Sequence, residues 1–283
     1  MTWTLTDDLD VYTATVGPFL AEDPVTETVL LTLTRSLREH GAHTYGQGQP
    51  LLGWWTDPAG RLSAALLQAP GRALLLSRCP DAAVVELEQV LAEHTDRIAE
   101  ARVAVEHEDM ISDMVVRRTG TAPKVVVRSR LYRLGEFLPP DPTPTGAAHS
   151  ATAEDRDLAI RWSTAFLEGL GETDTPEGVA AHTDERMGRG ELRLWRRPDG
   201  VPVCMASISA PIEGMSRISL VYTPPEHRRR GYAAALTAAL CQVALAAGVR
   251  ETLLFTDLAN PTANRVYQRI GFVPVSDAVV LGW

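Results

Sequence analysis

The stretch from Ser216 to Ala233 constrains this 283-residue chain more than any other part of it. It begins as an alternating, β-branched run, is interrupted by Pro224-Pro225, and passes through three consecutive arginines and Gly231 into a long alanine-rich segment. Period-two alternation predicts a strand, the prolines and the glycine predict a turn, and the alanine-rich segment predicts a helix. The sequence therefore predicts a strand, a turn and a helix in direct succession.

The residues of this turn favour the binding of an anion. The first amides of a helix have no intrahelical acceptor, and the helix dipole makes that end electropositive. Arg228, Arg229 and Arg230 add three cations at the same place. Gly231 has no Cβ, so that the backbone can approach a bulky group, and the small Ala233 keeps the next position open. We therefore expect the turn to hold a pyrophosphate.

The composition limits the classes of partner. The formal net charge of -9 argues against a general role at nucleic acids or membrane surfaces and makes the arginine triplet a local exception. Three widely spaced cysteines form neither a disulfide framework nor a metal cluster, which is typical of a reducing cytoplasm. The first residues lack the basic and apolar regions of a signal peptide, and the apolar window 233–249 is interrupted by polar residues as a packed helix would be. We therefore expect a cytoplasmic protein without a membrane span.

The carboxyl-terminal half reads as alternating helices and strands around this stretch. The predicted elements are helices at 154–167, 176–187 and 232–247 and strands at 191–195, 201–209, 251–257 and 277–283. After the strand at 251–257 the chain continues with a second motif, in which Asn260 is followed seven residues later by Tyr267 and the segment closes on Gly271-Phe272.

These features together resemble the GNAT N-acetyltransferase superfamily. The pattern Arg228-x-x-Gly231-x-Ala233 resembles its acyl-CoA signature, and the segment from Asn260 to Phe272 resembles its second cofactor motif. The resemblance implies an α/β (mixed α+β) fold with a central mixed antiparallel and parallel sheet flanked by helices. It also implies acetyl-CoA as co-substrate and no metal.

The resemblance carries roles onto single residues of this chain. The backbone of Val221, Tyr222 and Thr223 would bind the pantetheine arm, and Asn260 would contact the pantetheine amides. The pyrophosphate would be held by Arg228, Arg229, Arg230, Gly231, Tyr232, Ala233 and Ala234. The alternatives are that the arginines are simply solvated and that Asn260-Pro261 is only a turn.

Tyr267 is the candidate catalytic acid. Attack of an amine on a thioester expels a thiolate, and a phenol with a pKa near 10 can protonate a thiolate whose conjugate acid has a pKa of about 8.5. The alternative is that Tyr267, with its neighbours at helical spacing, faces the core. The general base is not fixed by the sequence, and the candidates are Glu172, Glu213, Asp257 and His227.

The amino-terminal half is predicted to have a related order of helices and strands, but it lacks the candidate cofactor-binding and catalytic residues. Its predicted elements are helices starting at Asp23-Pro24, at Asp81 and near Asp109, and strands at 51–56, 62–67, 73–77 and 124–128. Trp55 to Gly60 parallels Trp195 to Gly200, and Arg118-Thr-Gly120 parallels Arg269-Ile-Gly271, which favours an internal duplication over a chance similarity of two hairpins. In the first copy Ser77 to Asp81 replaces the arginine-glycine turn, and Val116 stands in place of Tyr267.

We therefore predict a degenerate GNAT-like domain at 1–137, a proline-rich linker at 138–150 and a catalytic domain at 151–283. The expected reaction is direct acetyl transfer from acetyl-CoA to a primary amine of a small molecule or peptide. The acidic segment 168–174 would suit a cationic acceptor. The alternative is a non-catalytic acyl-CoA sensor or interaction module, and a nucleic-acid role is weakly supported because the basic cluster is short.

Overall fold

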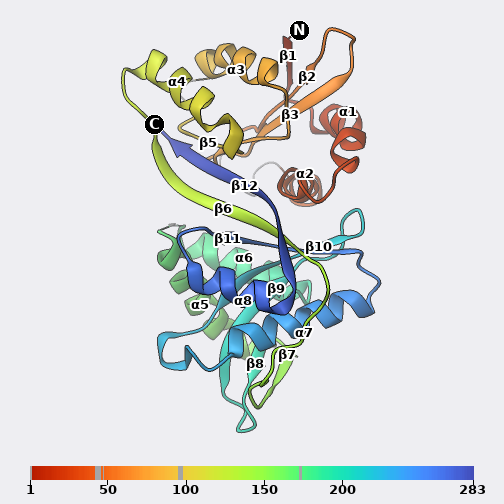
Figure 1. The fold of residues 1–283 in the computed structure, drawn as a ribbon, viewed down its shortest axis with the longest axis vertical. Coiled ribbons are helices and arrows are strands. Elements are labelled where there is room, and N and C mark those ends of the chain that lie inside the picture. The colour runs from red at the N-terminus through yellow and green to blue at the C-terminus, as the bar shows by residue number, and fades with distance from the viewer. Residues whose placement is uncertain (1, 42–45, 47, 95–97, 172–173) are drawn as a thin grey trace. The chain divides into compact units, whose positions relative to one another are not determined.

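The computed structural model describes residues 2–41, 46, 48–94, 98–171 and 174–283, and its packing divides the chain into two units (Figure 1). The amino-terminal unit comprises Met1–Leu131, Asp257–Ala259 and Val275–Trp283, and the carboxyl-terminal unit comprises Tyr132–Thr256 and Asn260–Pro274. The packing therefore changes unit at Leu131, before the predicted boundary at 137. The chain also returns to the amino-terminal unit for its last nine residues, which the prediction had placed in the second domain.

The amino-terminal unit combines antiparallel and parallel strands with four helices among its described residues. The helices are α1 (Leu9–Ala21), α2 (Thr28–His40), α3 (Asp81–Glu93) and α4 (Glu108–Thr119). The strands are β1 (Thr2–Thr6), β2 (Leu51–Thr56), β3 (Leu62–Gln68), β4 (Leu74–Leu76), β5 (Glu100–Ala104), most of β6 (Lys124–Leu134) and the end of β12 (Phe272–Gly282). β4 and β5 run parallel, whereas β12 pairs antiparallel with β5 from Ala278 to Gly282.

Strand alternation gives this unit a core on each face of its sheet. Trp3, Trp55 and Leu66 point to the face covered by α3 and α4, whereas Leu52 and Leu67 point to the face covered by α1 and α2. Successive side chains of a strand point to opposite faces, so one run of apolar residues supplies both cores. This explains why β2 and β3 are almost continuously apolar.

Several elements of this unit differ from the prediction. The helix expected at Asp23-Pro24 begins only at Thr28, because residues 22–27 form turns. Strands β1 and β5 and helix α1 were not predicted, and α1 contains Pro18 inside it, which hides its helical pattern. Asp81 is the first residue of α3 rather than its cap, which is Pro80.

The carboxyl-terminal unit is built on a mixed sheet ordered β11-β10-β9-β8-β7. Its strands are β7 (Ala147–Ser150), β8 (Leu192–Arg196), β9 (Pro202–Ile208), β10 (Met215–Tyr222) and β11 (Glu251–Asp257), and its helices are α5 (Arg156–Leu170), α6 (Pro176–Gly188), α7 (Tyr232–Ala246) and α8 (Pro261–Ile270). Only β10 and β11 are parallel within this order. Helices α7 and α8 supply the core of one face, and α5 packs over the other.

The predicted α/β class with a mixed sheet is confirmed by both units. The segment 138–150 departs from the predicted linker, because its last four residues form β7, which pairs with β8 from Ala147 to Ser150. Leu138 also donates its amide to the carbonyl of Ile270 at 2.9 Å. The proline-rich composition therefore marks an ordered connection that is tied to the carboxyl-terminal unit at both ends.

Candidate active site

The two parallel strands at the centre of the carboxyl-terminal unit pair over only part of their length. The register joins Met215–Ile218 to Glu251–Leu254, and among the described residues it includes nothing beyond Ile218. From Ser219 onward, β10 therefore presents backbone groups that β11 does not satisfy. Such an open strand end can accept an extended ligand as an additional strand would be accepted.

A distortion of β10 accompanies this opening. The antiparallel register with β9 shifts between Ser219 and Tyr222, and Leu220 adopts a φ of 55°. A non-glycine residue in this left-handed region stores strain of about 1–3 kcal/mol, which the surrounding structure must maintain. Bulges of this kind redirect the strand and commonly lie next to functional sites. The end of β10 is therefore turned away from regular pairing where the sequence predicted the site.

The turn between β10 and α7 exposes a series of unpaired amides. Within the described residues, no backbone amide from Arg229 to Ala234 has a hydrogen-bond acceptor, and α7 has no side-chain cap. Arg229 and Gly231 both have positive φ, at 61° and 80°. Successive amides in such a conformation form a concave nest for an anion at the positive end of the helix.

The three arginines of the turn have different positions. Arg228 donates its Nε to the carbonyl oxygen of Thr223 at 2.9 Å and so closes the turn onto the end of β10. Arg229 and Arg230 are exposed, and neither side chain has an ion pair or hydrogen bond with any described residue. The guanidinium groups of Arg229 and Arg230 are therefore available to an anion, whereas Arg228 has a structural partner.

The turn requires Gly231 to adopt a left-handed backbone conformation. Its φ of 80° disfavours any side chain, and a Cβ there would lie 3.6 Å from Cδ of Pro144. Tyr232, Ala233 and Ala234 follow as the first turn of α7, with Tyr232 buried in the core and the two alanines half-buried. The small alanines leave their amides accessible.

Cys204 contacts the residue that follows β10, and the sequence analysis did not predict this contact. The Thr223 hydroxyl donates to Sγ of Cys204 at 3.2 Å, and Cys204 is fully buried on β9. Burial raises the pKa of the Cys204 thiol to about 12, so that it stays protonated at neutral pH. Cys204 is therefore a support for Thr223 rather than a nucleophile.

Tyr267 lies in α8, with 7% of its surface exposed and its ring edge-on to Phe272 at 6.1 Å. Burial, followed by the proximity of Cys204, raises the pKa of the Tyr267 phenol above its usual value. The phenol has no hydrogen-bond partner among the described residues, and it belongs to the same core cluster as Cys204 and Val221. The structure thus brings Tyr267 and the end of β10 into one neighbourhood and keeps the phenol protonated.

Asn260 serves the start of α8. Its Oδ1 accepts the amide of Ala263 at 3.0 Å, which is the geometry of a helix N-cap. A residue that the sequence analysis missed, Tyr132, anchors the same helix by donating its hydroxyl to Oδ1 of Asn264 at 3.0 Å. Tyr132 is fully buried, and the alternating residues 128–134 were the signal that could have identified it as part of a strand.

The candidate bases are not equivalent in the structure. Glu172 lies outside the described residues. Glu213 precedes β10 and lies at the opposite end from Thr223 of this eight-residue strand, which spans roughly 25 Å at about 3.3 Å per residue. Asp257 accepts the amide of Ala259 at 2.8 Å and so closes the turn after β11. His227, in the short helix Pro225–His227 before the arginines, has a buried Nδ1 without a hydrogen-bond partner.

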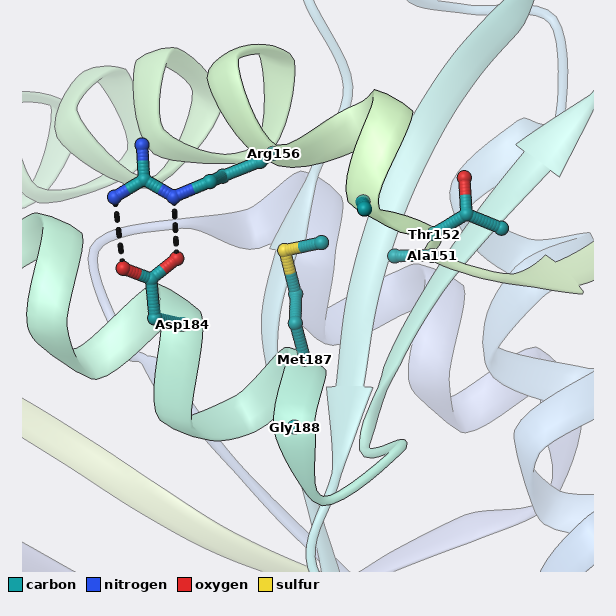
Figure 2. Close-up of a pocket in the computed structure, with 7 residues that line it drawn as sticks. Ala151, Thr152, Arg156, Asp184, Met187 and Gly188 are labelled. Carbon is teal, nitrogen blue, oxygen red and sulfur yellow. Dashed lines mark hydrogen bonds and ion pairs between the residues drawn. The ribbon is translucent and has the colours of Figure 1, made fainter.

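Aromatic side chains line the other side of the end of β10. The Trp162 ring on α5 lies 6.0 Å from that of Tyr222, and both side chains are half-buried, as is Phe166 one turn further along α5. A separate hollow of about 290 Å³ lies between the start of α5 and the end of α6 (Figure 2). Arg156 and Asp184 face each other across it in a two-bond ion pair at 2.7 and 2.8 Å, so its charged groups are already paired.

One family model matches part of the chain. Residues 159–272 match the model of the acetyltransferase (GNAT) family, and this segment contains β10, the arginine turn and Tyr267. No curated protein matches the chain. No helix in the described ranges is long and apolar enough to cross a membrane.

Solved structures resemble most or all of the chain at low sequence identity. An acetyltransferase of the GNAT family from Colwellia psychrerythraea is 11% identical, covers 100% of this chain and 99% of its own, and has a TM-score of 0.64. A GCN5-related N-acetyltransferase from Sphaerobacter thermophilus is 18% identical over 99% of this chain and 94% of its own, with a TM-score of 0.64. Another from Kribbella flavida is 24% identical over 78% of this chain and 86% of its own, with a TM-score of 0.54. At these identities the likeness shows the fold.

Proposed function

We propose that this chain, whose residues 159–272 match the model of the GNAT acetyltransferase family, transfers an acetyl group from acetyl-CoA to a primary amine of a small molecule or peptide. The observation that carries the proposal is the coincidence of two open backbone segments in one unit. Beyond Ile218 the end of β10 has no register with β11, and among the described residues the amides from Arg229 to Ala234 have no acceptor. An extended arm that ends in a diphosphate has the chemistry to satisfy both segments.

The residues present fit such a ligand. The amides of the arginine turn and the free guanidinium groups of Arg229 and Arg230 would hold the pyrophosphate by charge-assisted hydrogen bonds. The backbone of Val221, Tyr222 and Thr223 would bind the pantetheine arm. Arg228 would act through Thr223, whose carbonyl it fixes, and Asn260 would offer its amide nitrogen, because its oxygen already caps α8.

The chemical step requires few groups. Acetyl-CoA would supply an activated acyl group as a thioester. A backbone amide at the open end of β10 would donate a hydrogen bond to the thioester carbonyl that the amine attacks, as in an oxyanion hole. Tyr267 would donate its proton to the departing sulfur, a role that its raised pKa permits because the phenol remains protonated at neutral pH.

The amine must lose its own proton before it attacks. Among the described candidates, His227 retains a ring nitrogen without a partner and lies in the turn that follows β10. We propose His227, directly or through a water, as the acceptor of this proton. The side of β10 covered by Trp162 and Tyr222 is the proposed place of the acceptor molecule.

Calorimetric titration of acetyl-CoA into the full chain and into an Arg229→Glu, Gly231→Asp variant tests the proposal. The expected result is one site per chain that is lost in the variant, followed by release of free thiol when suitable primary amines are added. Two sites, or binding that survives the variant, would overturn the assignment of the site to the arginine turn.

In the second candidate function, the chain binds acyl-CoA but does not catalyse acetyl transfer. The half-buried Trp162 and Tyr222 at the open strand could bind a partner instead of an amine, and no carboxylate at the strand end has been assigned as base. A non-catalytic acyl-CoA sensor is therefore expected to bind acetyl-CoA tightly and to release no thiol with any amine of a broad set. Turnover with one amine that depends on Tyr267 would exclude this alternative.

A further inference from the structure

Strand β1 of the amino-terminal unit leaves one edge open. It stands at the end of the strand order and pairs with β2 alone among the described strands, residue for residue from Thr2 to Thr6 without a shift. In an antiparallel pair, alternate residues direct their N–H and C=O groups to the partner, and the intervening residues direct them outward. The outer edge of β1 therefore offers unpaired backbone groups.

This edge lacks the protection that natural sheets normally carry. Exposed edges are commonly blocked by lysine, proline, inward-pointing charge or a bulge. The strand reads Thr-Trp-Thr-Leu-Thr, which contains no charged residue and no proline, and its register with β2 is regular. An unprotected regular edge is either a hazard of aggregation or a surface with a partner.

A groove adjoins the open edge and indicates the chemistry of the partner. Its volume is about 410 Å³, and it is lined by β1 on one side and by α3 on the other. Leu5, Val85 and Val90 provide apolar lining, and Val85 is 60% exposed, which is unusual for a valine on a helix. The groove is thus a partly apolar binding surface beside the unpaired backbone groups of β1.

The charge of this groove has one sign. Glu86, Glu88 and Glu93 line it, and none of its described lining residues is lysine or arginine. Each carboxylate has one contact, with Trp55 Nε1, Arg117 and Gln89 respectively, at 2.9 to 3.1 Å. A carboxylate offers about four acceptor positions, so each retains capacity for a further cation.

We propose that β1 binds an extended peptide segment rich in lysine or arginine, which adds to the sheet as a further strand. Its backbone bonds the open edge, and alternate side chains enter the groove. Lysine and arginine suit this seat because their aliphatic stems lie on apolar surface while their charged heads reach carboxylates. A second copy of this chain is less suitable, because pairing of two β1 edges would bring together grooves of the same negative charge.

The test uses the full chain and three labelled peptides of equal length. The probe is acetyl-Thr-Lys-Val-Lys-Val-Lys-Thr-amide, the second peptide has glutamate in place of lysine, and the third has proline in place of the first valine. Binding is followed by fluorescence anisotropy and by hydrogen exchange of the β1 amides. The basic peptide is expected to bind, to slow exchange across residues 3–6 and to weaken with rising salt, whereas the other two bind at least about tenfold more weakly.

Matched variants separate the groove from general charge. Val85→Lys and, independently, Gln89→Lys place a cation in the groove and are expected to weaken the basic peptide about tenfold. Val243→Lys is the control, since Val243 is similarly exposed, at 48%, on α7 of the other unit, and it should change binding less than about twofold. Equal binding of all three peptides, binding that both groove variants leave unchanged, or a dimer with protected β1 amides in the absence of peptide would overturn the proposal.

Discussion

The turns that precede α3 and α7 occupy similar places in their units, but their backbone amides differ in hydrogen bonding. Each follows a strand that runs parallel to the next strand of its own unit, β4 beside β5 and β10 beside β11. In the amino-terminal unit the turn is closed from within, because Ser77 exchanges hydrogen bonds with Ala65 and the amide of Arg78 donates to Oε1 of Glu27 at 2.9 Å. In the carboxyl-terminal unit the amides from Arg229 to Ala234 have no acceptor within the described part of the chain.

The difference lies in the source of the acceptor. Glu27, with 3% of its surface exposed, brings a carboxyl group to the amide and Nε of Arg78, so that turn contains its own acceptor. Among the described residues, the turn at Gly231 has no such group, and on the proposed function the ligand would supply it. The same strand, turn and helix can therefore make a closed structural unit or a ligand site, depending on whether a buried carboxylate is present.

The hairpins of the two units show that their likeness is not limited to these turns. The registers of β2 with β3 and of β8 with β9 shift at the corresponding places, after Trp55 and after Trp195. Gly60 and Gly200 have φ values of 79° and 82° in the turns that follow. These matches support the predicted duplication, which stays a prediction.

Inserting a carboxylate into the open turn should have the largest effect. Gly231→Asp makes the arginine turn resemble its closed counterpart and places negative charge beside amides that are proposed to bind a diphosphate. We expect the affinity for acetyl-CoA to fall about a thousandfold, or about 4 kcal/mol, as measured by calorimetry. Part of this loss is backbone strain, because the φ of 80° disfavours any side chain.

Gly231→Ala isolates that strain. It carries the same backbone penalty without the charge, and its Cβ would meet only ordinary van der Waals contact with Pro144 at 3.6 Å. A loss of about fivefold is expected from strain of about 1 kcal/mol. If alanine weakens binding as much as aspartate does, charge is not what distinguishes the two turns.

Much of this site was predictable because its signals are local. The strand at 251–257, the helix from Tyr232 and the turn at Gly231 follow from alternation, alanine content and the conformational freedom of glycine. The contact of Cys204 on β9 with Thr223, which follows β10, joins residues 19 positions apart, and the contact of Tyr132 with Asn264 spans 132 positions. No periodicity within one segment reports such pairs, so they could not be read from the sequence.

The same reasoning explains the errors in the fold. Helix α1 was missed because Pro18 lies inside it, and the return of the chain's last residues to the amino-terminal unit was missed because strand partners depend on topology. Cys79 is half-buried, Cys204 and Cys241 are buried, and all three thiols are free.

The closed turn should show its own pH dependence. Burial is the main cause that raises the pKa of Glu27 from 4.5 to about 7, against the opposing effect of Arg78. A carboxyl group whose pKa is higher in the folded state stabilises the fold fully below pH 4.5, and this contribution is lost as the pH rises to 7. The total is about 3 kcal/mol, at about 1.4 kcal/mol per unit of pKa.

Glu27→Gln removes this titration while an amide oxygen can still accept from Arg78. The free energy of unfolding of the variant, relative to the natural chain, should therefore rise by about 3 kcal/mol between pH 4.5 and pH 8. Urea unfolding at several pH values measures the difference, and titrations of other groups cancel in it. A constant difference across this range would mean that Glu27 is already ionised at low pH.

The two units also differ at the helix that follows the parallel pair, where Tyr267 is buried in α8 and Val116 is 42% exposed in α4. On the proposed function, Tyr267→Phe should lower kcat about a hundredfold and leave acetyl-CoA binding within about threefold, because only the proton donor is lost. Because the pKa of Tyr267 is raised by burial, its deprotonation should not limit kcat near neutral pH. Val116→Ala is the matched control and should leave kcat unchanged, whereas equal activity of Tyr267→Phe would remove Tyr267 from the mechanism.

The smallest expected effect concerns the support beneath the open strand. Thr223 is held by two contacts, its hydroxyl on Cys204 at 3.2 Å and its carbonyl on Arg228 at 2.9 Å. Thr223→Val removes only the first, and a weak bond to sulfur contributes about 1 kcal/mol or less, so kcat should fall about threefold to fivefold. Thr223→Ser keeps the hydroxyl and should restore most of the loss. If Thr223→Val and Thr223→Ser have the same kcat, the hydroxyl contact with Cys204 is unimportant and the contact of the Thr223 carbonyl with Arg228 alone positions the end of β10. The arginine turn would then have two roles, because it would position the strand that precedes it and also bind the proposed ligand.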